Sequence, residues 1–193
     1  MDKSIFPFFI FPNLSWFQTW NHDDNAVLEI QENWVKQSLR NRYEIAGPNG
    51  RQSLSVPTIK ATRKTFKDVK ISYIEDWVTH HQRSVKTAYN RSPYFEYYQD
   101  GFNQILASKP EYLLDLNQKA LMWLASKLQI DKGFETTKRY HENVLNDYRQ
   151  HEFSDTEAPT YQQVFEEKQG FLPNLSALDL LFNCGPEAGS FLI

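Results

Sequence analysis

An eleven-residue stretch that begins at Glu32 and ends at Arg42 combines one carboxylate with three cations and several amides. Arg42 could hold a carboxylate or a phosphate in a bidentate manner, and Asn41 and Lys36 could supply further donors. Arg40 would assist by electrostatic attraction of the same anion. The alternative is a polar loop held by internal ion pairs, for example between Glu32 and Arg42. The spacing therefore indicates either an anion site or a closed ionic loop.

A histidine on an apolar helix face is the second candidate for chemistry. His81 falls on the same predicted stripe as Trp77 and Val85. At such a position it could act as a general acid or base with a shifted pKa, with Glu32 as its partner or as a second base. The alternative is a core histidine that is satisfied by a hydrogen bond.

The start of the last predicted helix carries a third group of polar side chains. Ser176 and Asp179 have the spacing of a reciprocal N-cap, so capping is the expected role. Alternatively, Asn174 and Ser176 present donors at a helix N-terminus, which favours anions.

The formal net charge of −3 on 193 residues is unevenly distributed. The segment from Lys36 to Lys70 has a local balance of +7, so the remainder carries −10. A basic segment on an acidic protein suggests attraction of a local anion rather than a general nucleic-acid coat. We therefore expect an anionic small-molecule ligand and no nucleic acid. The alternative is a solvated loop with ordinary lysines.

No motif of a known catalytic class accompanies these residues. The chain lacks a glycine-rich phosphate fingerprint, HExxH and GxSxG, and its sequence indicates no particular cofactor. The stretch Thr136-Thr137-Lys138-Arg139 could contact phosphate. The five histidines are scattered and Cys184 is the only cysteine, so we expect neither a metal site nor an internal disulfide.

Elements that could position these side chains follow from hydrophobic periodicity. Apolar runs bounded by turn residues predict short strands at residues 4–10, 26–30, 42–45, 53–56 and 69–71. A short helix over residues 14–20 would join the first two strands, which is the opening of an α/β unit. Gly47-Pro48-Asn49-Gly50 predicts a hairpin turn between the next two.

Apolar spacings of three and four residues predict helices in the rest of the chain. We place them at residues 76–89, from Ser92-Pro93 onward, at 111–128, at 138–149 and up to residue 182. The predicted fold class is α/β. It is a single domain over residues 1–193, with a mixed sheet from the N-terminal half and a helical middle and C-terminal part.

Composition also bears on the compartment. Mean hydropathy is low and no apolar run approaches the ~20 residues of a spanning helix, so membrane insertion is not expected. The opening run from Ile5 to Phe11 is interrupted by Pro7 and is too short for a signal peptide. The single cysteine is typical of the reducing cytoplasm. No feature of the sequence specifies an oligomeric state.

Taken together, these segments resemble the WbqC-like family in its short form, over nearly the whole chain. The resemblance rests on segments in family order: Glu32-Asn33-Trp34, Lys36-Gln37-Ser38, Arg40-Asn41-Arg42, Gly47-Pro48-Asn49-Gly50, Trp77, His81, Ser92-Pro93-Tyr94-Phe95, Pro173-Asn174-Leu175-Ser176 and Leu178-Asp179-Leu180. Members often have an aromatic-glycine turn after the first strand. The turn at Phe11-Pro12-Asn13 lacks this glycine, which puts a close backbone approach to a ligand there in doubt.

The family is named for a protein of an O-antigen gene cluster, so the resemblance implies a role in surface-polysaccharide biosynthesis. Two hypotheses follow. The first is a cytosolic transferase-like enzyme that acts on an anionic small molecule, such as a nucleotide-sugar or an activated acyl donor. The second is a non-catalytic ligand-binding or scaffold protein of the same pathway. The sequence leaves open whether the chain is an enzyme.

Overall fold

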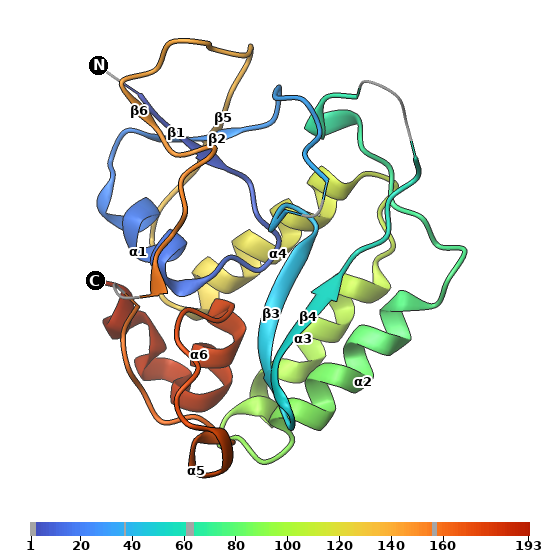
Figure 1. The fold of residues 1–193 in the computed structure, drawn as a ribbon, viewed down its shortest axis with the longest axis vertical. Coiled ribbons are helices and arrows are strands. Elements are labelled where there is room, and N and C mark those ends of the chain that lie inside the picture. Colours follow the sequence, from blue (N-terminus) through green and yellow to red (C-terminus); the bar gives the residue numbers. More distant parts are fainter. Residues whose placement is uncertain (1–2, 37, 61–63, 156–157) are drawn as a thin grey trace.

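The computed structural model describes residues 3–36, 38–60, 64–155 and 158–193. Gln37 of the family motif and Arg63 of the basic segment lie outside the described residues. Figure 1 shows a small sheet at one end of the molecule, a hairpin along its middle and helices around the rest.

The small sheet is parallel, with strand order β5-β2-β1-β6. Strand β1 (Ser4–Pro7) pairs with β2 (Ala26–Glu29), and helix α1 (Leu14–His22) connects the two. The outer strands β5 (Glu135–Thr136) and β6 (Asn146–Asp147) are two residues long. The carboxyl ends of all four strands lie at one edge, where parallel sheets usually bind ligands.

A second, separate sheet is the antiparallel hairpin of β3 (Arg42–Gly47) and β4 (Gly50–Ser55). Gly47 pairs with Gly50, so the turn consists of Pro48 and Asn49, as the sequence predicted. The hairpin lies between helix α2 (Trp77–Tyr89) and helix α6 (Ala177–Cys184) (Figure 1).

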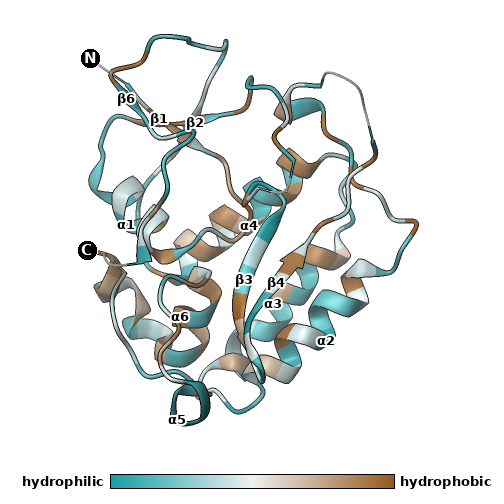
Figure 2. Ribbon diagram, viewed as in Figure 1, coloured by the Kyte–Doolittle hydropathy of each residue, from teal (hydrophilic) through white to brown (hydrophobic). Residues whose placement is uncertain are grey.

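The remaining elements are helical and surround the hairpin and the sheet. They are η1 (Phe66–Asp68), α3 (Phe95–Ala107), α4 (Leu113–Lys127), α5 (Glu166–Gln169) and η3 (Gly185–Leu192). Figure 2 shows α5 as hydrophilic, while hydrophobic and hydrophilic residues alternate along α2. This alternation is the amphipathic pattern of a helix that buries one face.

The core is one hydrophobic cluster with many aromatic rings from the N-terminal segment. Trp16 and Trp20 stack with centroids 5.4 Å apart, and Trp16 meets Phe6 edge to face at 6.1 Å. These contacts hold α1 on one face of the sheet. Within the described residues, no helix combines the length and apolar character needed to cross a bilayer.

The α/β class is confirmed, but the predicted mixed sheet is in fact two sheets, and two of the parallel strands come from residues 135–147. The helix predicted over 138–149 is wrong, because this polar segment instead pairs with β1 through Asn146 and Asp147. Ser92 donates to the carbonyl of Tyr89 and ends α2, so α3 begins later, at Phe95. Residues 69–71 form only isolated bridges.

Candidate functional site

A cleft of ≈ 220 Å³ lies beyond the carboxyl end of β1. Its walls come from the β1–α1 turn, the start of β3 and two C-terminal segments. The side chains that matter below are Phe11, Arg42, Tyr43, Glu44, Arg51, Asp155, Asn174 and Ser176. Three of the eight predicted site residues, all of them described by the structure, line this cleft: Arg42, Asn174 and Ser176.

Two lining residues adopt a left-handed backbone although neither is glycine. Phe11 has φ 43° and Asn174 has φ 52°. Surrounding contacts hold both. Phe11 is buried against Tyr43 at a centroid distance of 5.0 Å, and Asn174 Oδ1 accepts from the N–H of Ser15 at 2.9 Å. Phe11 thus takes the backbone conformation that glycine favours in the turn where the sequence lacks one. Such strain collects at functional sites.

The two arginines of the cleft differ in the number of hydrogen bonds and ion pairs that their guanidinium groups form. Arg51 donates to Glu44 at 2.7 Å and to the carbonyl of Pro173 at 2.7 Å, and lies 3.5 Å from Asp155. Arg42 donates only from Nε, to Ser55 Oγ at 3.2 Å. Its terminal nitrogens make no hydrogen bond or ion pair within the part of the chain that the structure describes. Arg42 is therefore free to receive an anion.

Ser176 caps α6 at the floor of the cleft. Its Oγ accepts from the N–H of Leu178 at 3.3 Å, which confirms the predicted N-cap. The N–H of Ala177 donates to the carbonyl of Pro12 at 2.9 Å. The donors at this helix end are thus used internally, so the helix terminus itself offers little to a ligand. The predicted return bond, from the N–H of Ser176 to the side chain of Asp179, is wrong. The N–H of Ser176 donates to the carbonyl of Glu44 instead.

Asp179 instead lies fully buried at the centre of a polar cluster. It accepts from the hydroxyls of Tyr89 and Tyr161, each at 2.6 Å, from Gln163 at 3.1 Å and from Asn183 at 3.3 Å. Burial raises the pKa of Asp179, while these donors lower it in part. Sequence reasoning missed this role because the three-residue spacing to Ser176 explained Asp179 as a cap.

Glu32 and Arg40 form a buried bidentate pair. Arg40 Nε lies 2.6 Å from Oε1 and Nη2 lies 2.8 Å from Oε2, with side chains 3% and 5% exposed. Arg40 Nη2 also donates to the carbonyl of Arg149 at 3.2 Å. The ion-pair alternative of the sequence is thus realised, although the partner is Arg40 and not Arg42. Burial raises the pKa of Glu32, and Arg40 opposes that rise.

A second buried ionic group adjoins the same edge of the sheet. Glu29, the last residue of β2, accepts from Thr137 Oγ1 at 2.6 Å and lies 3.5 Å from Arg149. Arg149 Nε also donates to Asp147 at 2.8 Å and packs under the ring of Tyr140. Glu29 lies near the end of the strand predicted over residues 26–30, so its position could have indicated one member of this group. The group connects the segments that follow β2, β5 and β6.

His81 is buried behind the hairpin. Its Nε2 lies 3.2 Å from the carbonyl of Ser55, so Nε2 carries the proton, and Nδ1 accepts from the hydroxyl of Tyr43 at 3.1 Å. Both ring nitrogens are thereby engaged. Ser55 also accepts from Arg42, so His81 is placed to position the strand that presents the arginine.

The titration of His81 should make stability depend on pH. Burial lowers its pKa to about 4 from 6.5, so the unfolded chain binds the proton more readily and acidification favours unfolding. This contribution is full above pH 6.5 and is lost as the pH falls toward 4. Between pH 7 and pH 5 the free energy of unfolding should fall by about 2 kcal/mol more in the wild type than in His81→Gln. Urea titrations at both pH values measure the free energy of unfolding of each protein. An equal fall between pH 7 and pH 5 in the wild type and in His81→Gln would contradict the assignment.

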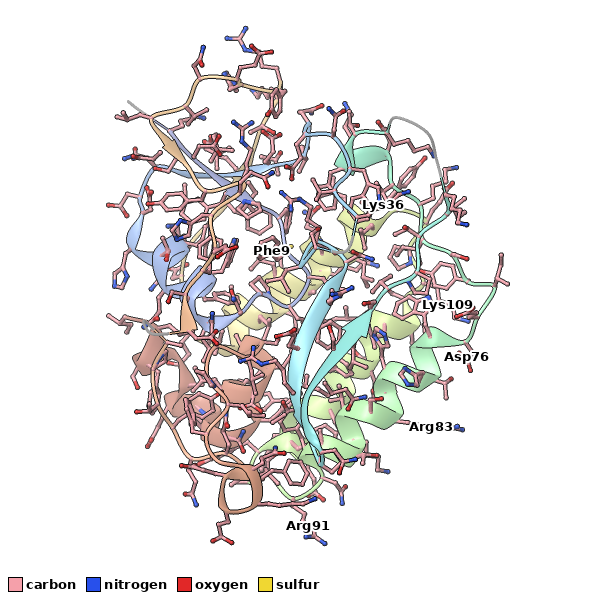
Figure 3. The ribbon with its side chains drawn as sticks, viewed as in Figure 1. Phe9, Lys36, Asp76, Arg83, Arg91 and Lys109 are labelled. Carbon is pink, nitrogen blue, oxygen red and sulfur yellow. The ribbon has the colours of Figure 1, made fainter. Side chains whose placement is uncertain are left out.

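The last two predicted residues lie outside the cleft. Asn41 donates from Nδ2 to the carbonyl of Val56 at 2.9 Å and so ties the loop to the end of β4. Lys36 is exposed (Figure 3) and bonds to no described residue. Glu32 pairs with Arg40 while His81 pairs with Tyr43 and Ser55, so the structure does not bring the two predicted catalytic side chains together.

Comparison with known proteins identifies one family. The model of the WbqC-like protein family matches residues 9–150 and 146–191. No curated protein and no solved structure matches the chain. The family match spans the cleft, the ionic groups at the strand ends and the helices that hold them. The chain therefore belongs to the WbqC-like protein family.

Proposed function

We propose that the chain binds a small anionic molecule in the Arg42 cleft, as a transferase-like enzyme of surface-polysaccharide biosynthesis. Its place of action would be the cytosol. The substrate would be a nucleotide-sugar or an activated acyl donor whose carboxylate or phosphate meets Arg42. The cleft of ≈ 220 Å³ holds the anionic group, and the rest of such a ligand would extend outward.

The observation that carries the proposal is the uncommitted guanidinium of Arg42. Two hydrogen bonds from a planar guanidinium to a carboxylate or phosphate are strong because they are charge-assisted. Arg51 is paired with Glu44 and lies 3.5 Å from Asp155, so among the described lining residues Arg42 is the cation that has no acidic partner. The left-handed Phe11 and Asn174 also line the cleft, and strained backbone of this kind is maintained by the contacts around it.

Substitution of Arg42 tests the proposal. A thermal-shift screen of nucleotide-sugars, nucleotides, acyl-coenzyme A compounds and amino acids should yield a ligand that stabilises the wild type by roughly 2.7 kcal/mol at 100 times its Kd. Arg42→Ala should weaken that ligand about 10- to 100-fold, because one charged partner is lost. The matched control is Arg83→Ala, since Arg83 projects outward from α2 (Figure 3). Equal affinity in the wild type and Arg42→Ala would refute the site.

The second candidate is a non-catalytic ligand-binding or scaffold protein of the same pathway. It is favoured by the hydrogen bonds that occupy both nitrogens of His81, which leave this residue unsuited to proton transfer in the observed arrangement. Under this alternative, His81→Gln lowers stability and leaves turnover of any identified substrate unchanged. Under the enzyme proposal with His81 as acid or base, the same change abolishes turnover while binding persists.

A further inference from the structure

We propose that a second cleft, on the sheet face that carries Ile5 and Val27, binds a nucleoside diphosphate. This cleft measures ≈ 1040 Å³ and lies between the sheet and the loop that joins β5 to β6. It shares no lining residue with the Arg42 cleft. The inference goes beyond the proposed function, which stands or falls separately.

The floor of the second cleft is apolar. Ile5 of β1 and Val27 of β2 are adjacent in register and point to the face opposite Phe6 and Leu28, since side chains alternate along a strand. Val144 and Leu145 add apolar wall, and Figure 2 shows a short hydrophobic segment before β6 in an otherwise hydrophilic loop. Leu145 is 80% exposed. Ile5 and Val27 are only 3% and 4% exposed, so the accessible apolar surface of the cleft comes mainly from Val144 and Leu145, and it suits one face of a nucleobase.

The loop that forms the wall is fixed at both ends and at its middle. Thr137 is buried and bonds to Glu29 at one end, and Asn146 donates to Ser4 Oγ at 3.2 Å at the other. Between them, the ring of Tyr140 lies 4.5 Å from the Arg149 guanidinium. The cleft is therefore preformed, as ligand sites usually are.

The rim is cationic. Lys3, Lys138 and Arg139 line it, and the one lining carboxylate among the described residues, Glu135, is already paired with Lys3 at 2.8 Å. Across the described ranges, Lys138 and Arg139 form no hydrogen bond or ion pair with a side chain. Lys138 and Arg139 line the cleft together with Thr136, and their two charges match those of a pyrophosphate, whereas the Thr137 hydroxyl is already used by Glu29 and by the N–H of Ile30.

Apolar floor, cationic rim and size together select the ligand class. Phosphate alone would leave the floor unused, and an uncharged nucleoside would leave Lys138 and Arg139 unpaired. A nucleoside diphosphate uses both, with its base against Val144 and Leu145 and its phosphates on the rim. The volume of ≈ 1040 Å³ lies just above the range typical of small-molecule sites, so a nucleoside diphosphate would fit with room to spare.

Isothermal titration of the full chain with uridine diphosphate and adenosine diphosphate tests the proposal, with uridine and inorganic phosphate as partial probes. At least one diphosphate should bind more tightly than either partial probe. The double variant Lys138→Gln/Arg139→Gln should weaken it about 100-fold or more, because two charged contacts are lost. Leu145→Glu, at an exposed position that leaves the fold intact, should weaken it by placing a charge beside the base.

The control double variant Arg83→Gln/Lys86→Gln removes the same charge from α2 and should leave binding unchanged. Arg42→Ala should also leave it unchanged. Absence of diphosphate binding at millimolar concentration, or equal affinity in the Lys138/Arg139 variant, would overturn the second site. Loss of binding in Arg42→Ala alone would also overturn it, and would place the nucleotide in the first cleft in agreement with the proposed function.

Discussion

Replacing Arg40 with methionine is expected to lower the free energy of unfolding by about 3–5 kcal/mol. The substitution leaves the Glu32 carboxylate buried without its bidentate partner and also removes the bond to the Arg149 carbonyl. An uncompensated buried charge is far more costly than the loss of the attraction itself. Chemical denaturation at pH 7 measures the change.

The double variant Glu32→Leu/Arg40→Met separates this explanation from a simple loss of packing. Once both charges are gone, no carboxylate is stranded, so the double variant should be more stable than Arg40→Met alone. Lys70→Met is the matched control, since Lys70 and Glu111 form an exposed pair, and exposed pairs contribute little to stability. Additive losses in the double variant would show that the pair is not coupled.

Asp179→Ala is the second substitution with a large expected effect, again a loss of about 3–5 kcal/mol in the free energy of unfolding. It leaves the hydroxyls of Tyr89 and Tyr161 and the amide of Gln163 without their common acceptor in the core. Each buried donor without a partner costs about 1–3 kcal/mol. Urea denaturation at neutral pH gives the value.

The control for Asp179 is a carboxylate at a similar place in another helix. Asp115 lies in the first turn of α4 and is exposed, so Asp115→Ala should cost less than about 1 kcal/mol. Tyr161→Phe removes one donor and keeps the ring, so it should cost about 1 kcal/mol. If Asp179→Ala were as mild as Asp115→Ala, the cluster would not be a determinant of stability.

Local patterns predicted the elements whose structure depends on nearby residues. Helix α1 follows from the aromatic stretch after Asn13, the hairpin from its glycine-proline turn, and α2 and α4 from apolar stripes. Strands β5 and β6 could not be predicted, because two-residue strands have no periodicity and exist only through pairing with β2 and β1. For this reason the helix predicted over residues 138–149 is wrong: the pairing of Asn146 and Asp147 with β1 has no signal in the local sequence.

In the candidate site, too, the sequence predicted what depends on residue type and neighbours, and it did not predict contacts between distant segments. Arg42 was predicted from its residue type and its place in a basic segment, and it lines the cleft. The choice of Arg40 as the partner of Glu32 depends on how the loop folds back, which the spacing of charges does not encode. The left-handed Phe11 was not predicted either, because its conformation is imposed by packing on Tyr43 and Phe102.

The order of the strands has a consequence for synthesis on the ribosome. Ser4 in β1 and Asn146 in β6 are 142 residues apart in the chain. At 5–20 residues per second, about 7–30 s pass between the translation of β1 and that of the strand that covers its outer edge. Throughout that interval Ser4 and Ile5 keep one strand edge unpaired next to the aromatic run that follows them, and an unpaired edge is where nascent chains associate wrongly. Slow elongation or a shortage of chaperones should therefore lower the yield of native protein before it affects the stability of the finished fold.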